Sequence, residues 1–295
     1  MMPLRRFRRP LVAAGVAASC VAAVAWGCFD PERIHIEPEP PNDTCAGAND
    51  LGEGGVFAGD TGPAGDDHEP VAGCGAPGGR DVWFRFTLDA PEVVYLDTVD
   101  GNTWDSVLVL YGGTCGDLAR PPLCADDQCP GESGGRRSQL VERLEAGSYV
   151  VVVDGRDAAA AGPFALRFQR AACAGAIGLP GNGAYDGNSM GWDDRFRGSC
   201  GEPGVPDTTY YLGLCAPREV TASTCGSMER CDSILTLAAG GCEAADELAC
   251  NDDDDTCRFG MGRSTVTATL PQGLNFLILE SRSPPGPYRL TVSGM

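Results

Sequence analysis

The chain has 295 residues, which suits two modest domains plus a leader, and its formal net charge is −19. This charge argues against a nucleic-acid partner, because nucleic acids are bound through clustered positive charge. All 22 basic side chains are arginines, so lysine nucleophiles, Schiff bases and the phosphate-binding Gly-Lys-Ser/Thr loop are excluded.

Residues 1–27 have the form of a secretory signal, with four arginines followed by an uncharged stretch rich in alanine and valine. The stretch ends Val24-Ala25-Trp26-Gly27-Cys28, which resembles a lipobox. The resemblance predicts cleavage before Cys28 and a palmitate-type lipid on that cysteine, which would attach the protein to a membrane. Cys20 is a rival lipidation site. An uncleaved anchor is a third interpretation, because the uncharged stretch approaches the length of a bilayer span.

Residues 28–41 are rich in proline, which holds a chain extended and prevents regular hydrogen bonding. We expect a linker that lifts the following domains away from the membrane. The chain has 15 cysteines, and 13 of them follow Cys28 without clustering into metal-binding pairs. Cysteines in such number are typical of disulfides in an oxidising compartment, which predicts an extracytoplasmic protein.

The body of the chain repeats itself once, at an offset of about 126 residues by direct alignment of the two halves. The motif Asp105-Ser-Val-Leu-Val-Leu returns as Asp232-Ser-Ile-Leu-Thr-Leu, and Cys124-Ala-Asp-Asp returns as Cys250-Asn-Asp-Asp. The repeat predicts two domains of one fold, at residues 42–171 and 172–295.

Both copies read as β-strands. Residues 82–86, 93–96 and 149–153 are β-branched and aromatic runs separated by turn-forming residues. Residues 138–144 have helical propensity, but their counterpart at 264–270 alternates apolar and polar residues as a strand does. We therefore predict strands at both places, and an all-β fold of two tandem antiparallel jelly-roll-like sandwiches, rich in disulfides.

The order of these motifs resembles the pre-peptidase C-terminal domain found in lipoproteins of myxobacteria and their relatives. Asp81-Val-Trp-Phe-Arg-Phe, Asp105-Ser-Val-Leu-Val-Leu-Tyr and Leu144-Glu-Ala-Gly-Ser-Tyr-Val-Val-Val-Val-Asp-Gly carry the likeness, which covers most of both copies. The resemblance implies a jelly-roll-like sandwich, calcium binding and adhesion to a ligand. Such domains often follow a secreted peptidase, but residues 42–295 are taken up by the two copies and leave no room for a catalytic domain.

Eight cysteines that match between the copies are the disulfide candidates. We expect Cys45 to pair with Cys74 and Cys173 with Cys200, while Cys115 with Cys124 and Cys242 with Cys250 would each close a tight loop. Connectivity cannot be deduced from spacing alone. Cys129 and Cys257 also correspond, with partners left open. Because 13 is odd, one thiol is expected to be unpaired or intermolecular.

Acidic loops are the candidate metal sites. Asp126-Asp127 recurs as Asp252-Asp253 and is extended by Asp254-Asp255, and carboxylates crowded together favour a hard cation such as calcium. Asp105 and Asp232 could lie nearby. The alternative is a solvated acidic turn, since the loops lack the pattern of an EF-hand. No cofactor is required by the sequence, and calcium is the one that it suggests.

Catalytic patterns are weak. Gly187-Asn-Ser-Met-Gly matches a nucleophile elbow, but the only histidines, His35 and His68, both precede it, and we expect a loop there. Trp104 and Trp192 fall in expected loops, where exposed aromatic rings could bind a sugar.

The sequence thus favours a non-catalytic lipoprotein of a Gram-negative outer membrane or cell surface. We expect an adhesion or ligand-binding module whose partner is a polysaccharide or an envelope protein. A purely structural envelope protein is the alternative, and a hydrolase that uses carboxylates is the third hypothesis.

Overall fold

The computed structural model describes residues 38–130, 136–226, 232–257, 262–282 and 285–295. The chain divides into two units, Met1–Pro38 and Glu39–Met295, and every described strand belongs to the second. Cys28 and the rest of the expected signal lie outside the described residues, as does Cys231. In the described part of the chain, no helix is long and apolar enough to cross a membrane.

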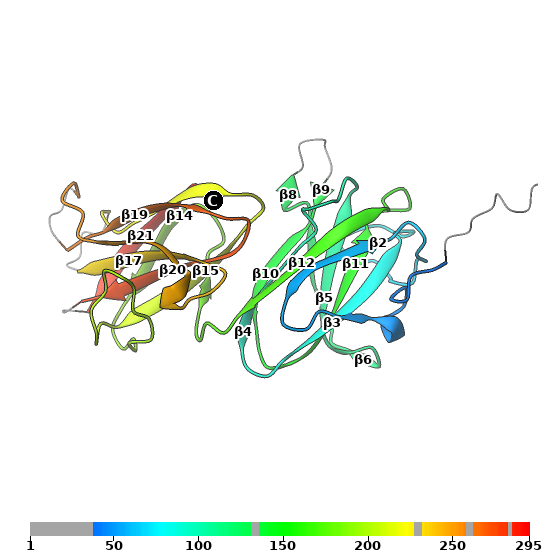
Figure 1. Cartoon of the computed structure of the whole chain (residues 1–295), viewed down its shortest axis with the longest axis horizontal. Helices are drawn as coiled ribbons and strands as arrows, with labels where there is room; N and C mark the ends of the chain where they lie inside the picture. Colours follow the sequence, from blue (N-terminus) through cyan, green and yellow to red (C-terminus); the bar gives the residue numbers. More distant parts are fainter. Residues whose placement is uncertain (1–37, 131–135, 227–231, 258–261, 283–284) are drawn as a thin grey trace, which may run out of the picture. The chain divides into compact units, whose positions relative to one another are not determined.

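The first half of Glu39–Met295 is a sandwich of two antiparallel-rich sheets (Figure 1). One sheet has the order β1 (Asn49–Asp50), β3 (Asp81–Leu88), β11 (Gly147–Gly155), β5 (Ser106–Thr114), and both β6 (Asp117–Leu118) and β7 (Leu123–Asp126) pair with β5. The other has the order β10 (Gln139–Leu144), β4 (Glu92–Asp97), β12 (Pro163–Ala171), β2 (Gly55–Asp60). A separate two-stranded ribbon joins β8 (Cys129–Pro130) to β9 (Arg136–Arg137).

The second half repeats the topology of both sheets, although β6 and the β8–β9 ribbon have no counterpart among its described strands. One sheet has the order β13 (Ile177–Gly178), β15 (Asp207–Leu214), β20 (Gly273–Ser281), β17 (Ser233–Ala239), β18 (Glu247–Asp252). The other has the order β14 (Gly183–Asn188), β21 (Pro287–Ser293), β16 (Arg218–Ser223), β19 (Thr265–Leu270). No described sheet mixes strands of the two halves, so the all-β fold of two β-sandwiches expected from the repeat is confirmed.

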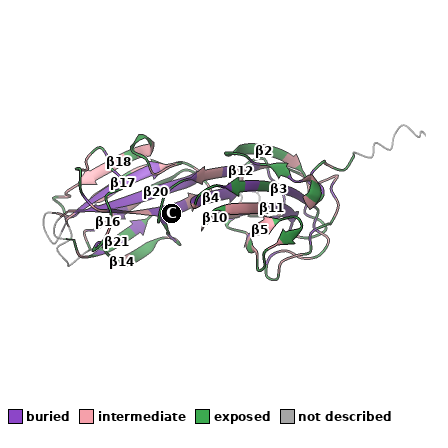
Figure 2. Ribbon diagram, turned by 90° about the horizontal axis from the view of Figure 1, so that it is seen from below, coloured by how far each residue is buried: buried purple, intermediate pink, exposed green. Residues whose placement is uncertain are grey.

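Each sandwich encloses its own apolar core. Phe84, Phe86, Leu96 and Phe168 are nearly or fully buried in the first core. In the second sandwich every residue of β20 is buried, and Figure 2 shows buried residues running along β17 and β20. These central strands are β-branched or leucine-rich runs, because both of their faces are covered.

The ambiguous segment 138–144 forms strand β10, as its counterpart predicted. β10 pairs antiparallel with β4 along its whole length, from Gln139 opposite Asp97 to Leu144 opposite Glu92. Burial of Leu140 and Leu144 in the first core accompanies this pairing. Tertiary packing therefore decides the conformation over the local helical propensity.

An apolar cluster lies where the two sandwiches meet within Glu39–Met295. Val93, Tyr95 and Ala171 of the first sandwich pack in one buried cluster with Tyr211 and Phe276 of the second. The Tyr95 hydroxyl donates a hydrogen bond to the carbonyl oxygen of Leu214 at 3.2 Å, and the Leu274 amide donates one to Oε1 of Gln169 at 2.8 Å. Burial of this apolar area stabilises the contact.

Six disulfides join the described cysteines, and these correct the pairing expected from spacing. Cys45 pairs with Cys115 rather than Cys74, and Cys74 pairs with Cys124. The second sandwich repeats this pattern with Cys173–Cys242 and Cys200–Cys250. The prediction that each cysteine pairs with the next one along the chain is wrong, because the fold brings together cysteines that are 50 and 70 positions apart. All eight candidate cysteines are therefore in disulfides, but with exchanged partners.

The remaining two disulfides distinguish the copies. Cys257 pairs with Cys225 inside the second sandwich, whereas its counterpart Cys129 pairs with Cys215, which belongs to the other sandwich. A covalent bond thus joins the two halves of Glu39–Met295. Six disulfides in one chain indicate an extracytoplasmic, oxidising compartment.

Candidate functional site

The first acidic cluster consists of Asp105, Asp126 and Asp127. Asp105 immediately precedes β5, Asp126 ends β7, and Asp127 follows it. One carboxylate oxygen from each lies within 4.8 Å of the others. Asp127 has a φ of 71°, the left-handed conformation that few residues other than glycine adopt.

The second acidic cluster is the repeat of the first, made of Asp232, Asp252 and Asp253 within the same 4.8 Å limit. Asp253 has a φ of 65°, so the unusual backbone conformation is repeated along with the carboxylates. The structure thus brings Asp105 and Asp232 to the acidic loops, as the motif order suggested. The two clusters sit at equivalent ends of the two sandwiches.

Arginines partly neutralise both clusters. Nε of Arg156 lies 3.0 Å from Oδ2 of Asp126, and Nη1 of Arg136 lies 2.9 Å from Oδ2 of Asp127. In the second cluster Arg282, the counterpart of Arg156, pairs with Asp252 at 2.7 Å. Some carboxylate oxygens still have no hydrogen-bond partner among the described residues. These atoms are Oδ1 of Asp105 and Asp126 in the first cluster and Oδ1 of Asp232 in the second.

The local electrostatics favours proton or cation binding in both clusters. Burial, followed by repulsion from Asp127 and Asp126, raises the pKa of Asp105. Burial and then repulsion from Asp127 raise the pKa of Asp126, while Arg156 opposes the rise. Burial likewise raises the pKa of Asp232, with Arg282 opposing it. A divalent cation would relieve the same repulsion.

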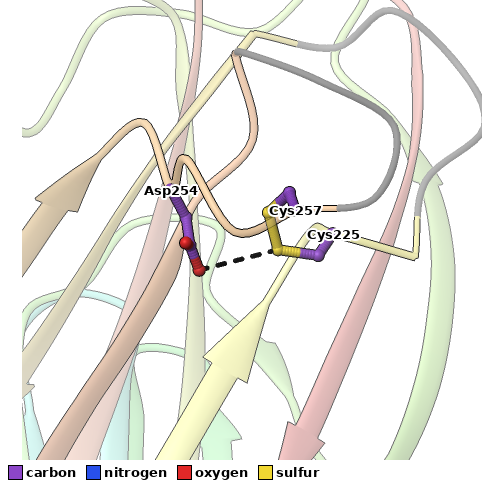
Figure 3. Close-up of side chains that lie close together, drawn as sticks. All are labelled: Cys225, Asp254 and Cys257. Carbon is purple, nitrogen blue, oxygen red and sulfur yellow. Dashed lines mark hydrogen bonds between the residues drawn. A yellow bond between two sulfur atoms is a disulfide. The ribbon is translucent and has the colours of Figure 1, made fainter.

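Asp254 and Asp255, also expected in a metal site, do not join the second cluster. Asp254 lies beside the Cys225–Cys257 disulfide, with its Oδ2 3.8 Å from Sγ of Cys225 (Figure 3). Its Oδ1 accepts hydrogen bonds from the amide and the hydroxyl of Thr256, which lowers the pKa of Asp254. Because both sulfurs are bonded to each other, this group offers no thiolate to a metal.

Each sandwich also holds one pair of buried carboxylates that face each other on neighbouring strands. Asp81 stands opposite Asp154 across β3 and β11, and Asp207 stands opposite Glu280 across β15 and β20. Asp81 is fully buried and accepts hydrogen bonds from the amides of Asp67 and His68 and from the Trp83 ring. Spacing alone did not mark these residues as a group, although Asp81 and Asp207 align in the repeat.

In the first sandwich, His68 contacts Asp154 of this carboxylate pair. Its Nδ1 lies 3.1 Å from Oδ2 of Asp154, and its Nε2 lies 2.9 Å from the hydroxyl of Tyr111. Only 5% of His68 is exposed, and Asp154 and Tyr111 are also buried. The arrangement satisfies buried polar groups, and solvent-borne substrates do not reach the imidazole.

The two tryptophans considered for sugar binding are not free side chains. Trp104 is only 8% exposed, packs in the first core, and donates a hydrogen bond from Nε1 to the carbonyl oxygen of Pro163. Trp192 is half-buried and packs edge-on against Tyr288. The expectation of an exposed Trp104 is wrong, because its ring packs edge-on against Phe164 in the first core.

Ser189 of the elbow-like motif follows the end of β14 and is fully buried. Its hydroxyl lies 2.8 Å from that of Ser281 and bonds the carbonyl oxygen of Gly286. The expected loop is therefore only partly right: Gly187 and Asn188 end strand β14, and the loop begins at Ser189, whose buried hydroxyl is not presented as a nucleophile.

No protein-family model matches the chain, and no curated protein matches it. Among solved structures, the pre-peptidase C-terminal domain of collagenase from Bacillus anthracis aligns with 45% of this chain and 97% of its own, at 13% identity and a TM-score of 0.28. The CUB1-EGF-CUB2 domains of rat MASP-1 align with 83% of this chain and 99% of their own, at 10% identity and a TM-score of 0.21. Scores this low do not assign a family.

Proposed function

We propose that the protein is a non-catalytic, extracytoplasmic binding module whose two sandwiches each hold a calcium ion. The observation that carries the proposal is the duplication of one arrangement: three aspartates of each copy approach within 4.8 Å of one another. Oxygen-only ligands of this kind suit calcium rather than a transition metal. Burial of His68, one of only two histidines, supports a role without general-base catalysis.

The fit to calcium is chemical as well as geometric. In the first cluster Arg156 and Arg136 each engage one oxygen of an aspartate, which leaves the Oδ1 atoms of Asp105 and Asp126 without partners. Calcium accepts six to eight oxygens, and backbone carbonyls and waters complete such shells. A site with three carboxylates on loops belongs to the weaker class, with dissociation constants of about 10⁻⁴–10⁻³ M in extracellular modules.

The proposal includes attachment to a membrane through a lipid on Cys28, at the outer membrane or cell surface, with the proline-rich linker as a spacer. The six disulfides support the extracytoplasmic setting. Labelling with a fatty-acid probe should be lost in Cys28→Ala. Continued labelling of that variant would refute lipidation at this residue.

Calorimetric titration of calcium into the purified chain, with its disulfides intact, tests the metal sites. We expect two ions per chain, and one after the double substitution Asp126→Asn, Asp127→Asn. The control is Asp255→Asn, which removes an exposed carboxylate from the acidic run of the second copy without touching either cluster. At a calcium concentration 100-fold above the dissociation constant, each site should add about 2.7 kcal/mol to the free energy of unfolding.

Two results would contradict the proposal. The first is a titration without heat together with a melting temperature that neither chelator nor calcium changes. The second is equal loss of binding in the Asp255→Asn control, which would show that calcium follows net charge rather than the two clusters.

A further inference from the structure

A cleft of about 990 Å³ opens between the two sandwiches of Glu39–Met295. Its first wall comes from residues near β8, β9 and β10, and its second from residues around β13, the start of β16 and the turn before β20. The Cys129–Cys215 disulfide lies on the lining and joins the two walls. A cleft of this size is in the range of small-molecule and oligomer binding sites.

Two arginines without carboxylate partners face this cleft from opposite walls: Arg137 from β9 and Arg218 from the start of β16. Within the described ranges neither forms an ion pair, although the chain has 41 acidic residues and 22 basic ones. Nε of Arg137 is buried and has no hydrogen-bond partner among the described residues. Arginines left unpaired in so acidic a protein are available to an external anion.

Amide side chains also line the cleft. Nε2 of Gln272 donates a hydrogen bond to Oδ2 of Asp97 at 3.4 Å, and Oε1 of Gln139 accepts one from the Tyr95 hydroxyl at 3.2 Å. The other amide atom of each has no hydrogen-bond partner among the described residues, and both glutamines line the cleft together with Gln128. Each such group can donate to or accept from a hydroxyl group.

The apolar residues of the lining offer little to a ligand. Leu179 is 7% exposed and Leu214 is 3% exposed, because both belong to the core of the second sandwich. The cleft therefore has no deep apolar pocket for a peptide side chain. Its polar side chains are two guanidinium groups, the four amides of Gln128, Gln139, Asn182 and Gln272, the Tyr211 hydroxyl and one carboxylate, that of Glu142. Guanidinium and amide groups therefore predominate, and they match carboxylates and hydroxyls.

We propose that this cleft binds a carboxylate-bearing oligosaccharide, with Arg137 and Arg218 pairing with uronate groups and the glutamines binding ring hydroxyls. This inference deepens the proposed binding function by naming its site and ligand class, but it does not depend on the calcium clusters. The disulfide between Cys129 and Cys215 keeps the two walls at a constant separation, so the site is organised before the ligand arrives.

The test is calorimetric titration of the purified chain with a short oligogalacturonate, first in chelator and then in calcium. Its methyl ester, with the same hydroxyls and no charge, and a polyglutamate peptide serve as comparison ligands. We expect binding of the acid form only, weakened about tenfold by Arg137→Gln and again by Arg218→Gln, since a charge-assisted hydrogen bond is lost each time. Arg197→Gln is the matched control, because Arg197 is an exposed arginine that lies outside the cleft and forms no ion pair with a described residue.

Each outcome separates the two proposals. Binding in chelator with no calcium sites would support the cleft and refute the metal proposal. Calcium binding without any oligogalacturonate binding would do the reverse. The cleft proposal is also overturned if the methyl ester binds equally, if polyglutamate binds more tightly, or if Arg197→Gln weakens binding as much as the two cleft variants. A circular dichroism spectrum unchanged from that of the parent chain shows that each variant is folded.

Discussion

Glu280 and Asp154 occupy the same position in the two copies, yet only Asp154 has a hydrogen-bonded partner. Asp154 contacts Nδ1 of His68 at 3.1 Å, whereas both carboxylate oxygens of Glu280 are buried without a partner among the described residues. Glu280 is 0% exposed and stands beside Asp207 on the neighbouring strand. Burial, and then repulsion from Asp207 and Asp194, raises the pKa of Glu280 to about 7.

The first prediction is that stability falls as the pH rises through this pKa. The folded pKa of about 7 lies above the ordinary value of 4.5, so Glu280 favours folding below about pH 4.5 and loses that contribution as the pH passes 7. Asp81 acts in the same direction, with a pKa raised to about 6 by burial. Glu280→Gln should therefore stabilise the protein by roughly 1–3 kcal/mol at pH 8 and change little at pH 5.

Urea unfolding at the two pH values measures this effect. The control is Glu219→Gln, which changes an exposed glutamate on β16 of the same sandwich. Equal stabilisation by both substitutions, or the same gain at pH 5 and pH 8, would show that Glu280 is not the group responsible.

The second prediction concerns the bond between the sandwiches. Replacing Cys129 and Cys215 by serine should lower the free energy of unfolding by about 2–4 kcal/mol, because the unfolded chain loses a long cross-link. The two sandwiches should then unfold in two resolved steps in a urea titration. The double substitution of Cys225 and Cys257, whose bond lies within one sandwich, should leave the coupling between the steps unchanged.

The third prediction follows from the burial of Trp104. Trp104→Ala should destabilise the protein by about 3–5 kcal/mol, because it removes a large ring from the first core and leaves the Pro163 carbonyl unpaired. Thermal unfolding measures the loss. Trp192→Ala should cost less, since Trp192 is half-buried. Loss of saccharide binding without loss of stability in Trp104→Ala would restore the original expectation of an exposed ring.

The fourth prediction uses the left-handed backbone of Asp127. Asp127→Gly removes a calcium ligand but eases a φ of 71°, so in chelator it should stabilise the protein by roughly 0.5–1 kcal/mol. In calcium the same substitution should lower the stability, because the loss of a calcium ligand then outweighs the relief of the backbone. Asp127→Ala, which removes the carboxylate without easing the backbone, should not stabilise under either condition. Melting temperatures of the three proteins with and without calcium provide the comparison.

The repeat carried most of what could be predicted from sequence. It identified strand β10 despite helical propensity, because residues 264–270 alternate clearly where residues 138–144 do not. It also placed the acidic loops in equivalent positions. Disulfide partners escaped prediction, because pairing Cys45 with Cys115 depends on which strands are neighbours in the sheet.

Other features of the sites depended on burial, which spacing does not reveal. Trp104 lies outside the strands, as its sequence context suggested, and only the folded chain shows that its ring packs in the first core. The cleft with Arg137 and Arg218 could not be found from sequence either, because its walls come from different sandwiches and neither arginine lies in a motif.

The apolar residues that join the two sandwiches are not repeated between the copies. Val93 and Tyr95 face the second sandwich, but their counterparts on β16 are the polar residues Glu219 and Thr221. Tyr211 faces the first sandwich, and its counterpart on β3 is the exposed Arg85. Each copy therefore has an apolar contact face that the other copy lacks at the equivalent position. If residues 172–295 were encoded ahead of residues 42–171 on a linker that kept Tyr211 from reaching Val93, both apolar faces would be left exposed. Such a protein would contain every strand and every intradomain disulfide, and we expect it to aggregate.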